Sequence, residues 1–160
     1  MIPTADRDTR MASTLSDLFQ LSKGNPVNHG GRLVHSIFSI LIKAGIQKCE
    51  FRRLRADFKK PSGMHFKCVG GMIEIDDFKT KQMTLWADTS PECSHFDIHA
   101  KKDCVLKIWN KWRVGNSEQA WLGNSGMMIT AKNSGLMFEC SQGFSEVDFS
   151  AFVAELTLKD

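Results

Sequence analysis

Four side chains that readily bind metal ions occur within one short stretch of the chain. They are Cys93, His95, His99 and Cys104. Thiolate sulfur and imidazole nitrogen are preferred zinc ligands, and four of them complete a tetrahedral site. Their spacing differs from that of zinc fingers, knuckles and ribbons. One hypothesis is a zinc-stabilised module that binds nucleic acid or another protein. The other interpretation is a polar surface loop with solvent-facing histidines and one buried cysteine.

A second group of residues suggests hydrolysis. Ser125 lies in the stretch Gly-Asn-Ser-Gly at positions 123–126. This stretch resembles the Gly-Asp-Ser-Gly sequence around the nucleophile of chymotrypsin-like proteases, and His65 and Asp88 precede it in that family's order. Asn124 stands where the family has an acidic residue. A serine or cysteine nucleophile needs a base within hydrogen-bond reach, so a small Ser/Cys hydrolase is a further alternative.

Basic residues alternate with tryptophan between positions 105 and 113. If this stretch is a β-strand, Lys107, Trp109, Lys111 and Arg113 project from the same face. Cations around an indole suit a nucleic-acid backbone with one stacked base, or an anionic membrane with the indole at headgroup level. The alternative is that Trp109 packs beneath a neighbouring element while the lysines only face solvent.

A second basic stretch covers residues 43–60. We expect the two stretches to merge, after folding, into one positively charged surface, because clustered cations create a local potential that attracts phosphates. The candidate nucleic-acid or anion-binding residues are Arg52, Arg53, Arg55, Lys59, Lys60, Lys107, Trp109, Lys111 and Arg113.

The composition is that of one ordinary globular domain. Its 160 residues are 42% hydrophobic and 24% charged, with a net charge of +3. Residues 1–60 hold 11 basic against 5 acidic residues, a charge of +6, so the remaining residues carry −3.

The most apolar stretch, residues 33–46, is interrupted by polar and charged side chains, which argues against a transmembrane segment. The first ten residues lack the apolar core of a signal peptide. Five cysteines without a Cys-x-x-Cys pair indicate reduced thiols. We therefore expect a cytoplasmic or nuclear protein.

The hydropathy pattern predicts an α+β fold, with two N-terminal helices followed by a mostly antiparallel β-sheet in a single domain over residues 13–160. Residues 1–12 are predicted to be a mobile arm. Thr14 and Asp17 form a capping-box pattern at the start of the first helix, and the second helix is expected over residues 33–43. Residues 48–59 fit a helix or a strand, and residues 88–103 are predicted to be a loop. Strands are expected at 64–69, 72–75, 83–87, 104–114, 127–132, 136–140 and 152–158. Residues 104–114 also fit a helix that begins after Asp103 and ends at Gly115.

These observations favour a non-enzymatic binding or assembly protein. The expected partner is nucleic acid, with RNA favoured, or an anionic membrane surface. A homo-oligomer is also expected, since the oppositely charged ends of the chain could pair between copies. Glycine-rich phosphate-binding motifs are absent from the sequence, so no small-molecule cofactor is expected. By analogy of type, such a chain is typical of viral matrix, coat or nucleic-acid-associated proteins.

Overall fold

The computed structural model describes residues 13–56, 61–143 and 146–160. These residues form one helix and fourteen strands. The elements are α2 (Leu15–Leu21), β1 (Val27–His29), β2 (Arg32–Val34), β3 (Phe38–Ile42), β4 (Gly45–Ala56), β5 (Ser62–Val69), β6 (Met72–Ile75), β7 (Phe78–Thr80), β8 (Gln82–Trp86), β9 (Cys93–Ala100), β10 (Cys104–Val114), β11 (Ser117–Gln119), β12 (Gly126–Lys132), β13 (Gly135–Ser141) and β14 (Phe152–Lys159).

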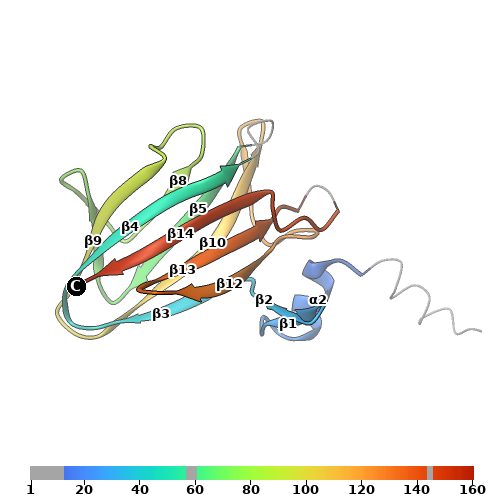
Figure 1. Cartoon of the computed structure of the whole chain (residues 1–160), viewed down its shortest axis with the longest axis horizontal. Helices are drawn as coiled ribbons and strands as arrows, with labels where there is room; N and C mark the ends of the chain where they lie inside the picture. Colours follow the sequence, from blue (N-terminus) through green and yellow to red (C-terminus); the bar gives the residue numbers. More distant parts are fainter. Residues whose placement is uncertain (1–12, 57–60, 144–145) are drawn as a thin grey trace, which may run out of the picture.

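Two antiparallel sheets pack face to face. The seven-stranded sheet has the order β12-β13-β14-β4-β9-β6-β7. The five-stranded sheet has the order β11-β10-β5-β8, and β3 also pairs with β10. In Figure 1, β4, β14, β13 and β12 lie in front of the fainter β5 and β10. The architecture is therefore a β-sandwich, in which each strand turns one face inward.

Aromatic side chains from both sheets form the centre of the core. The ring of Phe66 on β5 is fully buried, and its centroid lies 5.2 Å from Phe51 on β4 and 5.2 Å from Phe96 on β9. Further along the sandwich, Phe38 on β3 packs edge-on against Phe138 on β13 at 6.0 Å. Such pairs add about 0.5–1.5 kcal/mol each beyond the area that they bury. The aromatic contacts therefore hold the two sheets together.

One long hairpin belongs to both sheets. Strands β5 and β8 pair in the five-stranded sheet, and the chain between them forms the pair β6 and β7 in the seven-stranded sheet. The crossing from β5 to β6 uses Gly70, which has a φ of +94°, and Gly71. A Cβ at Gly71 would lie 2.8 Å from the carbonyl oxygen of His99. These glycines allow the sharp bend by which strands change sheets.

The short helix α2 covers the outer face of the seven-stranded sheet near strand β12. Its capping box is confirmed, because Thr14 Oγ1 accepts from the backbone of Asp17 while the Asp17 carboxylate accepts from the backbone of Thr14. Leu15 and Phe19 pack with Met128 of β12 in a second apolar cluster. The helix and the β1–β2 hairpin lie together at one side of the sandwich (Figure 1).

The predicted α+β class is wrong, because the second helix is absent from the described part of the chain. Residues 33–43 instead contribute to β2 and β3. Their apolar residues fit the helical period, but Phe38, Ile40 and Ile42 also alternate with Ser39 and Leu41 in the strand period. Pairing of β3 with β10 decides between the two periods, because it supplies backbone hydrogen bonds along the whole segment.

Two other segments settle as strands. Residues 48–56, which fitted both patterns, belong to β4, and the predicted loop 88–103 contains β9. The inward side chains of Phe96 and Ile98 alternate with polar outward residues. These polar residues led to the prediction of a loop, because half of the strand is polar. The strand at 104–114 and the hairpin of β12 and β13 are confirmed. In that hairpin Asn133, with a φ of +43°, takes the left-handed position of the turn. The predicted arm at residues 1–12 lies outside the described residues.

Replacing Phe66 by alanine will destabilise the fold strongly. The ring is fully buried between two aromatic neighbours, so Phe66→Ala is expected to lower the free energy of unfolding by about 3–5 kcal/mol. Denaturant unfolding measures the change. The control is Phe78→Ala at a 65% exposed phenylalanine, which is expected to change stability by less than about 0.5 kcal/mol. Equal effects of the two variants would contradict the assignment of Phe66 to the centre of the core.

Candidate functional site

Strand β10 carries its basic residues on the outer face of the five-stranded sheet. Lys107, Trp109, Lys111 and Arg113 share that face, while alternate side chains such as Ile108 fill the core. The predicted common face is therefore present. Three of these four side chains, however, are buried or paired, whereas the sequence suggests a row that is open to a ligand.

Trp109 is covered by other side chains. Only 8% of it is exposed. Its ring lies 4.5 Å from the His65 ring and 5.0 Å from the Trp121 ring, centroid to centroid. Burial also lowers the pKa of His65, so the imidazole beside the indole is neutral at pH 7. A nucleic-acid base has no open indole face to stack on at this position.

Two cations of the same row are neutralised by carboxylates. Lys111 Nζ lies 2.7 Å from a Glu118 oxygen, and this hydrogen bond lowers the pKa of Glu118. The guanidinium of Arg113 pairs with Asp88 and stacks over the Trp86 ring at 4.5 Å. Lys107 takes part in no salt bridge among the described residues. It is the cation of this row with its charge uncompensated.

The second basic group lies on strand β4. Arg52 faces outward and bonds to Glu50 at 3.2 Å. Arg53 is half-buried and donates to the carbonyl of Ser90, and Arg55 is exposed. Lys59 and Lys60 lie outside the described residues. Arg52 on β4 and Lys107 on β10 belong to different sheets and point away from the shared core in opposite directions, so these two residues do not join one surface as expected.

The structure instead gathers other lysines around a cleft where the long hairpin changes sheets. This cleft has a volume of about 910 Å³. Its apolar lining includes Ile46 and Val69, which are 64% and 45% exposed. Three lysines surround it: Lys67 on β5, Lys81 before β8 and Lys101 after β9. The connections β3–β4 and β9–β10 lie at the same end of the sandwich, where the C-terminus is marked (Figure 1).

Lys43 and Lys159 at this end pair with Asp103 and Glu50, but four other lysines there have no carboxylate partner in the described part of the chain. Lys67, Lys81, Lys101 and Lys107 take part in no salt bridge among the described residues. Lys67 and Lys107 also occupy directly opposite positions of β5 and β10. Two like charges placed opposite each other on one sheet face cost roughly 0.2–1 kcal/mol. An anion bound between them would remove that cost. We call Lys67, Lys81, Lys101 and Lys107 the lysine rim.

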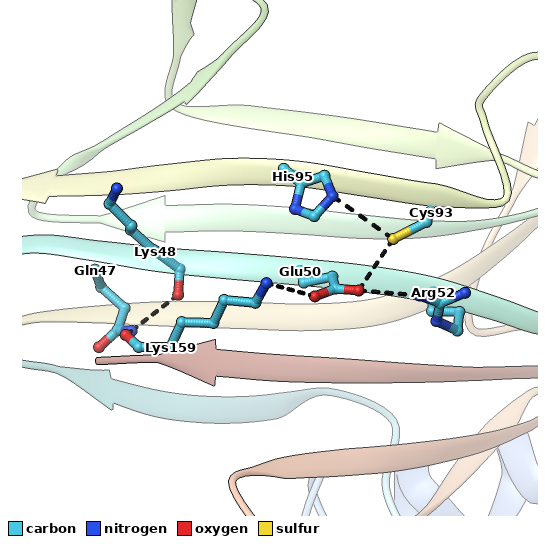
Figure 2. A network of polar contacts seen from close by, with 7 residues as sticks. All are labelled: Gln47, Lys48, Glu50, Arg52, Cys93, His95 and Lys159. Atoms are coloured by element: carbon cyan, nitrogen blue, oxygen red, sulfur yellow. Dashed lines mark hydrogen bonds and ion pairs between the residues drawn. The ribbon is translucent and has the colours of Figure 1, made fainter.

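A network of polar side chains lies on the outer face of the seven-stranded sheet. Figure 2 shows Glu50 at its centre. Lys159 Nζ lies 2.7 Å from Oε2 of Glu50, and Arg52 Nη2 and Cys93 Sγ each lie 3.2 Å from Oε1. Hydrogen bonds from Lys159 and Cys93 lower the pKa of Glu50 to about 2. Burial and the neighbouring carboxylate raise the pKa of Cys93, so a protonated thiol donates to an ionised carboxylate.

The predicted set of four zinc ligands is not brought together. Cys93, His95 and His99 share the outer face of β9. Cys104 is buried between the sheets, where its sulfur lies 3.8 Å from that of Cys68. The structure instead forms two groups of three possible ligands on β9 and its neighbours. They are Glu50, Cys93 and His95, and Glu74, Asp97 and His99.

Among the described residues no hydrogen bond joins Ser125 to a histidine, whereas the Cys93 thiol does lie beside one. Ser125 is 3% exposed, and both nitrogens of His65 are bonded to Thr84 and Gln82 on the outer face of the five-stranded sheet. Cys93 Sγ lies 3.8 Å from Nε2 of His95. Its acidic neighbour Glu50 contacts the sulfur, whereas in a catalytic triad the acid orients the imidazole. This arrangement keeps the thiol protonated and disfavours nucleophilic attack.

Sequence reasoning missed Lys67 and Lys81. One signal for Lys67 was visible, because the alternation over residues 64–68 places it on the face opposite Phe66. Its partner across the sheet depends on the register between β5 and β10, which no local pattern contains. Lys81 joins the lysine rim only because the chain returns after β7 from the seven-stranded sheet to the five-stranded sheet.

Comparisons of the chain with protein-family models, with curated proteins and with solved structures found no match. The described ranges contain no helix that is both long and apolar enough to cross a bilayer.

Replacing Glu50 by glutamine will remove a pH-dependent contribution to stability. The pKa of Glu50 in the folded chain is about 2, below its ordinary value of 4.5, so its stabilising effect is complete above pH 4.5 and disappears as the pH falls toward 2. The stability difference between the wild type and Glu50→Gln is therefore expected to be largest near neutral pH and to shrink across that interval. Denaturant unfolding at a series of pH values measures it.

The matched control is Glu92→Gln, which removes a carboxylate from an exposed loop. Its stability difference from the wild type is expected to be small at every pH. A Glu50→Gln difference that stays constant between pH 5 and 2 would show that Lys159 and Cys93 do not stabilise the ionised carboxylate.

Proposed function

We propose that the protein is a non-enzymatic binding protein that docks on anionic membrane surfaces through the lysine rim and the apolar cleft that Lys67, Lys81 and Lys101 line. The observation that carries the proposal is the direct opposition of Lys67 and Lys107 without a carboxylate partner among the described residues. Uncompensated cations near a membrane are attracted by the negative potential of acidic lipids, by about 1 kcal/mol for each lysine.

The exposed aliphatic side chains support a membrane rather than a purely ionic partner. Leu41, Val105 and Val69 form one row across β3, β10 and β5, adjacent to the row of Lys107 and Lys67. Leu41 is 61% exposed and Val69 is 45% exposed. Aliphatic groups flanked by lysines suit the boundary between headgroups and acyl chains, where the lysine stems cover apolar surface and the ammonium groups reach phosphate.

Membrane binding is favoured over RNA binding because the lining of the cleft contains no phenylalanine or tryptophan among the described residues. Recognition of single-stranded RNA relies on exposed aromatic rings that stack on bases. Trp109 is covered, and its neighbours Lys111 and Arg113 are already paired. RNA binding, self-association and a viral structural role stay predictions from the sequence.

Charge reversal at the rim will weaken membrane binding. Binding is measured by co-sedimentation with phosphatidylcholine vesicles that contain or lack phosphatidylserine, at low and at physiological salt. The wild type is expected to bind only the acidic vesicles, and more weakly at higher salt. Lys67→Glu combined with Lys101→Glu is expected to weaken binding by at least about 30-fold, since two lysines contribute about 1 kcal/mol each.

The control is Lys23→Glu in the loop after α2, at the side of the sandwich away from the cleft, and it is compared with Lys67→Glu alone, which makes the same charge change. Lys23→Glu is expected to bind like the wild type.

Val69→Ser with Ile46→Ser tests the apolar contribution, and this variant is expected to lose most binding that persists at physiological salt. A single-stranded RNA oligonucleotide provides the other arm. Binding to RNA without binding to acidic vesicles, or equal loss in Lys23→Glu, would overturn the proposal.

Charge reversal at Lys107 is expected to weaken membrane binding and to raise the free energy of unfolding. In Lys107→Glu a glutamate faces Lys67 across the sheet, and the repulsive pair becomes an attractive one. The free energy of unfolding should rise by about 0.5–1 kcal/mol while binding to acidic vesicles falls. Lys107→Gln, which removes only the repulsion, should give a smaller gain. A loss of stability in both variants would show that the opposed lysines do not repel each other.

A further inference from the structure

We infer that Glu50, Cys93 and His95 form a zinc site on the outer face of the seven-stranded sheet. This site lies apart from the lysine rim and does not depend on the membrane proposal. It keeps two of the ligands that the sequence suggests, Cys93 and His95, and replaces the remote Cys104 by a carboxylate from the neighbouring strand. Three protein ligands leave a fourth position open to solvent for water or for a partner's side chain.

The sheet holds the three donors in place. Glu50 and His95 are directly opposite in the pairing of β4 and β9, and Cys93 lies two positions from His95 on the same face. Figure 2 shows the sulfur between the carboxylate and the imidazole. Side chains that project from hydrogen-bonded strands keep their relative positions better than those on loops. The ligands are therefore preorganised by the backbone.

The distances suit a tetrahedral ion. Zinc bonds of about 2.3 Å to sulfur and about 2.1 Å to nitrogen or oxygen place the sulfur about 3.6 Å from each of the other donors. Cys93 Sγ lies 3.2 Å from Glu50 Oε1 and 3.8 Å from His95 Nε2. All three donor atoms lie within 4.8 Å of one another. The two distances from Cys93 Sγ therefore differ from the tetrahedral value by about 0.4 Å or less.

Zinc takes the place of a proton. In the metal-free chain the Cys93 thiol donates to Glu50. Binding breaks the S–H bond, forms a bond from sulfur to zinc, and releases one proton to the buffer. Oxygen Oε1 of Glu50 becomes a ligand, while Lys159 stays on Oε2 and orients the carboxylate. Such outer contacts fix the direction of a ligand.

Arg52 opposes the ion in the same geometry. Its guanidinium occupies Oε1 of Glu50, the oxygen that zinc needs. Arg52 therefore competes with the ion for this oxygen, and its positive charge repels zinc. The competition between Arg52 and zinc predicts that loss of Arg52 tightens zinc binding. If Arg52 only held the polar network in place, its loss would not tighten zinc binding.

Cobalt(II) and zinc titrations of the purified chain test the site. Cobalt bound to a thiolate gives a sulfur-to-metal charge-transfer band, so one equivalent of cobalt is expected to produce this band, and zinc is expected to abolish it. Calorimetry in two buffers of different ionisation enthalpy is expected to show about one proton released per zinc ion at a pH below the pKa of the thiol. Cys93→Ser is expected to abolish the band, and Glu50→Gln and His95→Gln to weaken binding by at least about tenfold.

Two further variants complete the design. Arg52→Gln is expected to tighten zinc binding severalfold. His99→Gln alters the neighbouring cluster on the same strand and is the matched control, which is expected to retain the band and the affinity. Thermal unfolding without metal confirms that each variant is folded. No band in the wild type, a band that persists in Cys93→Ser, or a weaker site in Arg52→Gln would each overturn the assignment.

Discussion

The burial of one face of every long strand between the two sheets determines where all the polar chemistry of this protein lies. Phe51 and Phe96 point inward to meet Phe66 from the other sheet. Because side chains alternate along a strand, the inward position of these rings forces Glu50 and His95 outward. A shift of one residue in either strand would exchange the polar set with the core set, so the aromatic contacts between sheets also set the register of the outer face.

The same constraint separates the two groups of cations. Inward residues on β10 and on β4 face each other across the core, and their outward neighbours therefore point away from each other. Clustering of basic residues along a sequence is thus a poor guide to clustering in space when consecutive strands belong to different sheets. The lysine rim forms for the converse reason. Lys67 and Lys107 are 40 positions apart in the chain, yet antiparallel pairing makes them neighbours.

Local patterns predicted those elements whose signals are local. The capping box at Thr14 and the alternation over 104–114 each contain their own information. The segment 33–43 does not, because its apolar residues satisfy both periods and only the distant partner β10 decides between them. The choice of zinc ligands failed for a related reason. Cys104 is close to His99 in the chain, but β9 and β10 belong to opposite layers. Glu50, which enters the group, comes from a strand more than forty positions earlier.

The place of β14 in the sheet order has a consequence for biosynthesis. This strand lies between β13 and β4, and it pairs residue 156 with residue 51. Strand β4 therefore leaves the ribosome long before its central neighbour exists, with one row of backbone amide and carbonyl groups unmatched. The large sheet closes only after β14 has left the exit tunnel. Such distant pairing slows folding relative to proteins built from sequence-adjacent contacts, and during that interval the unpaired edge of β4 is the part of the nascent chain most in need of a chaperone.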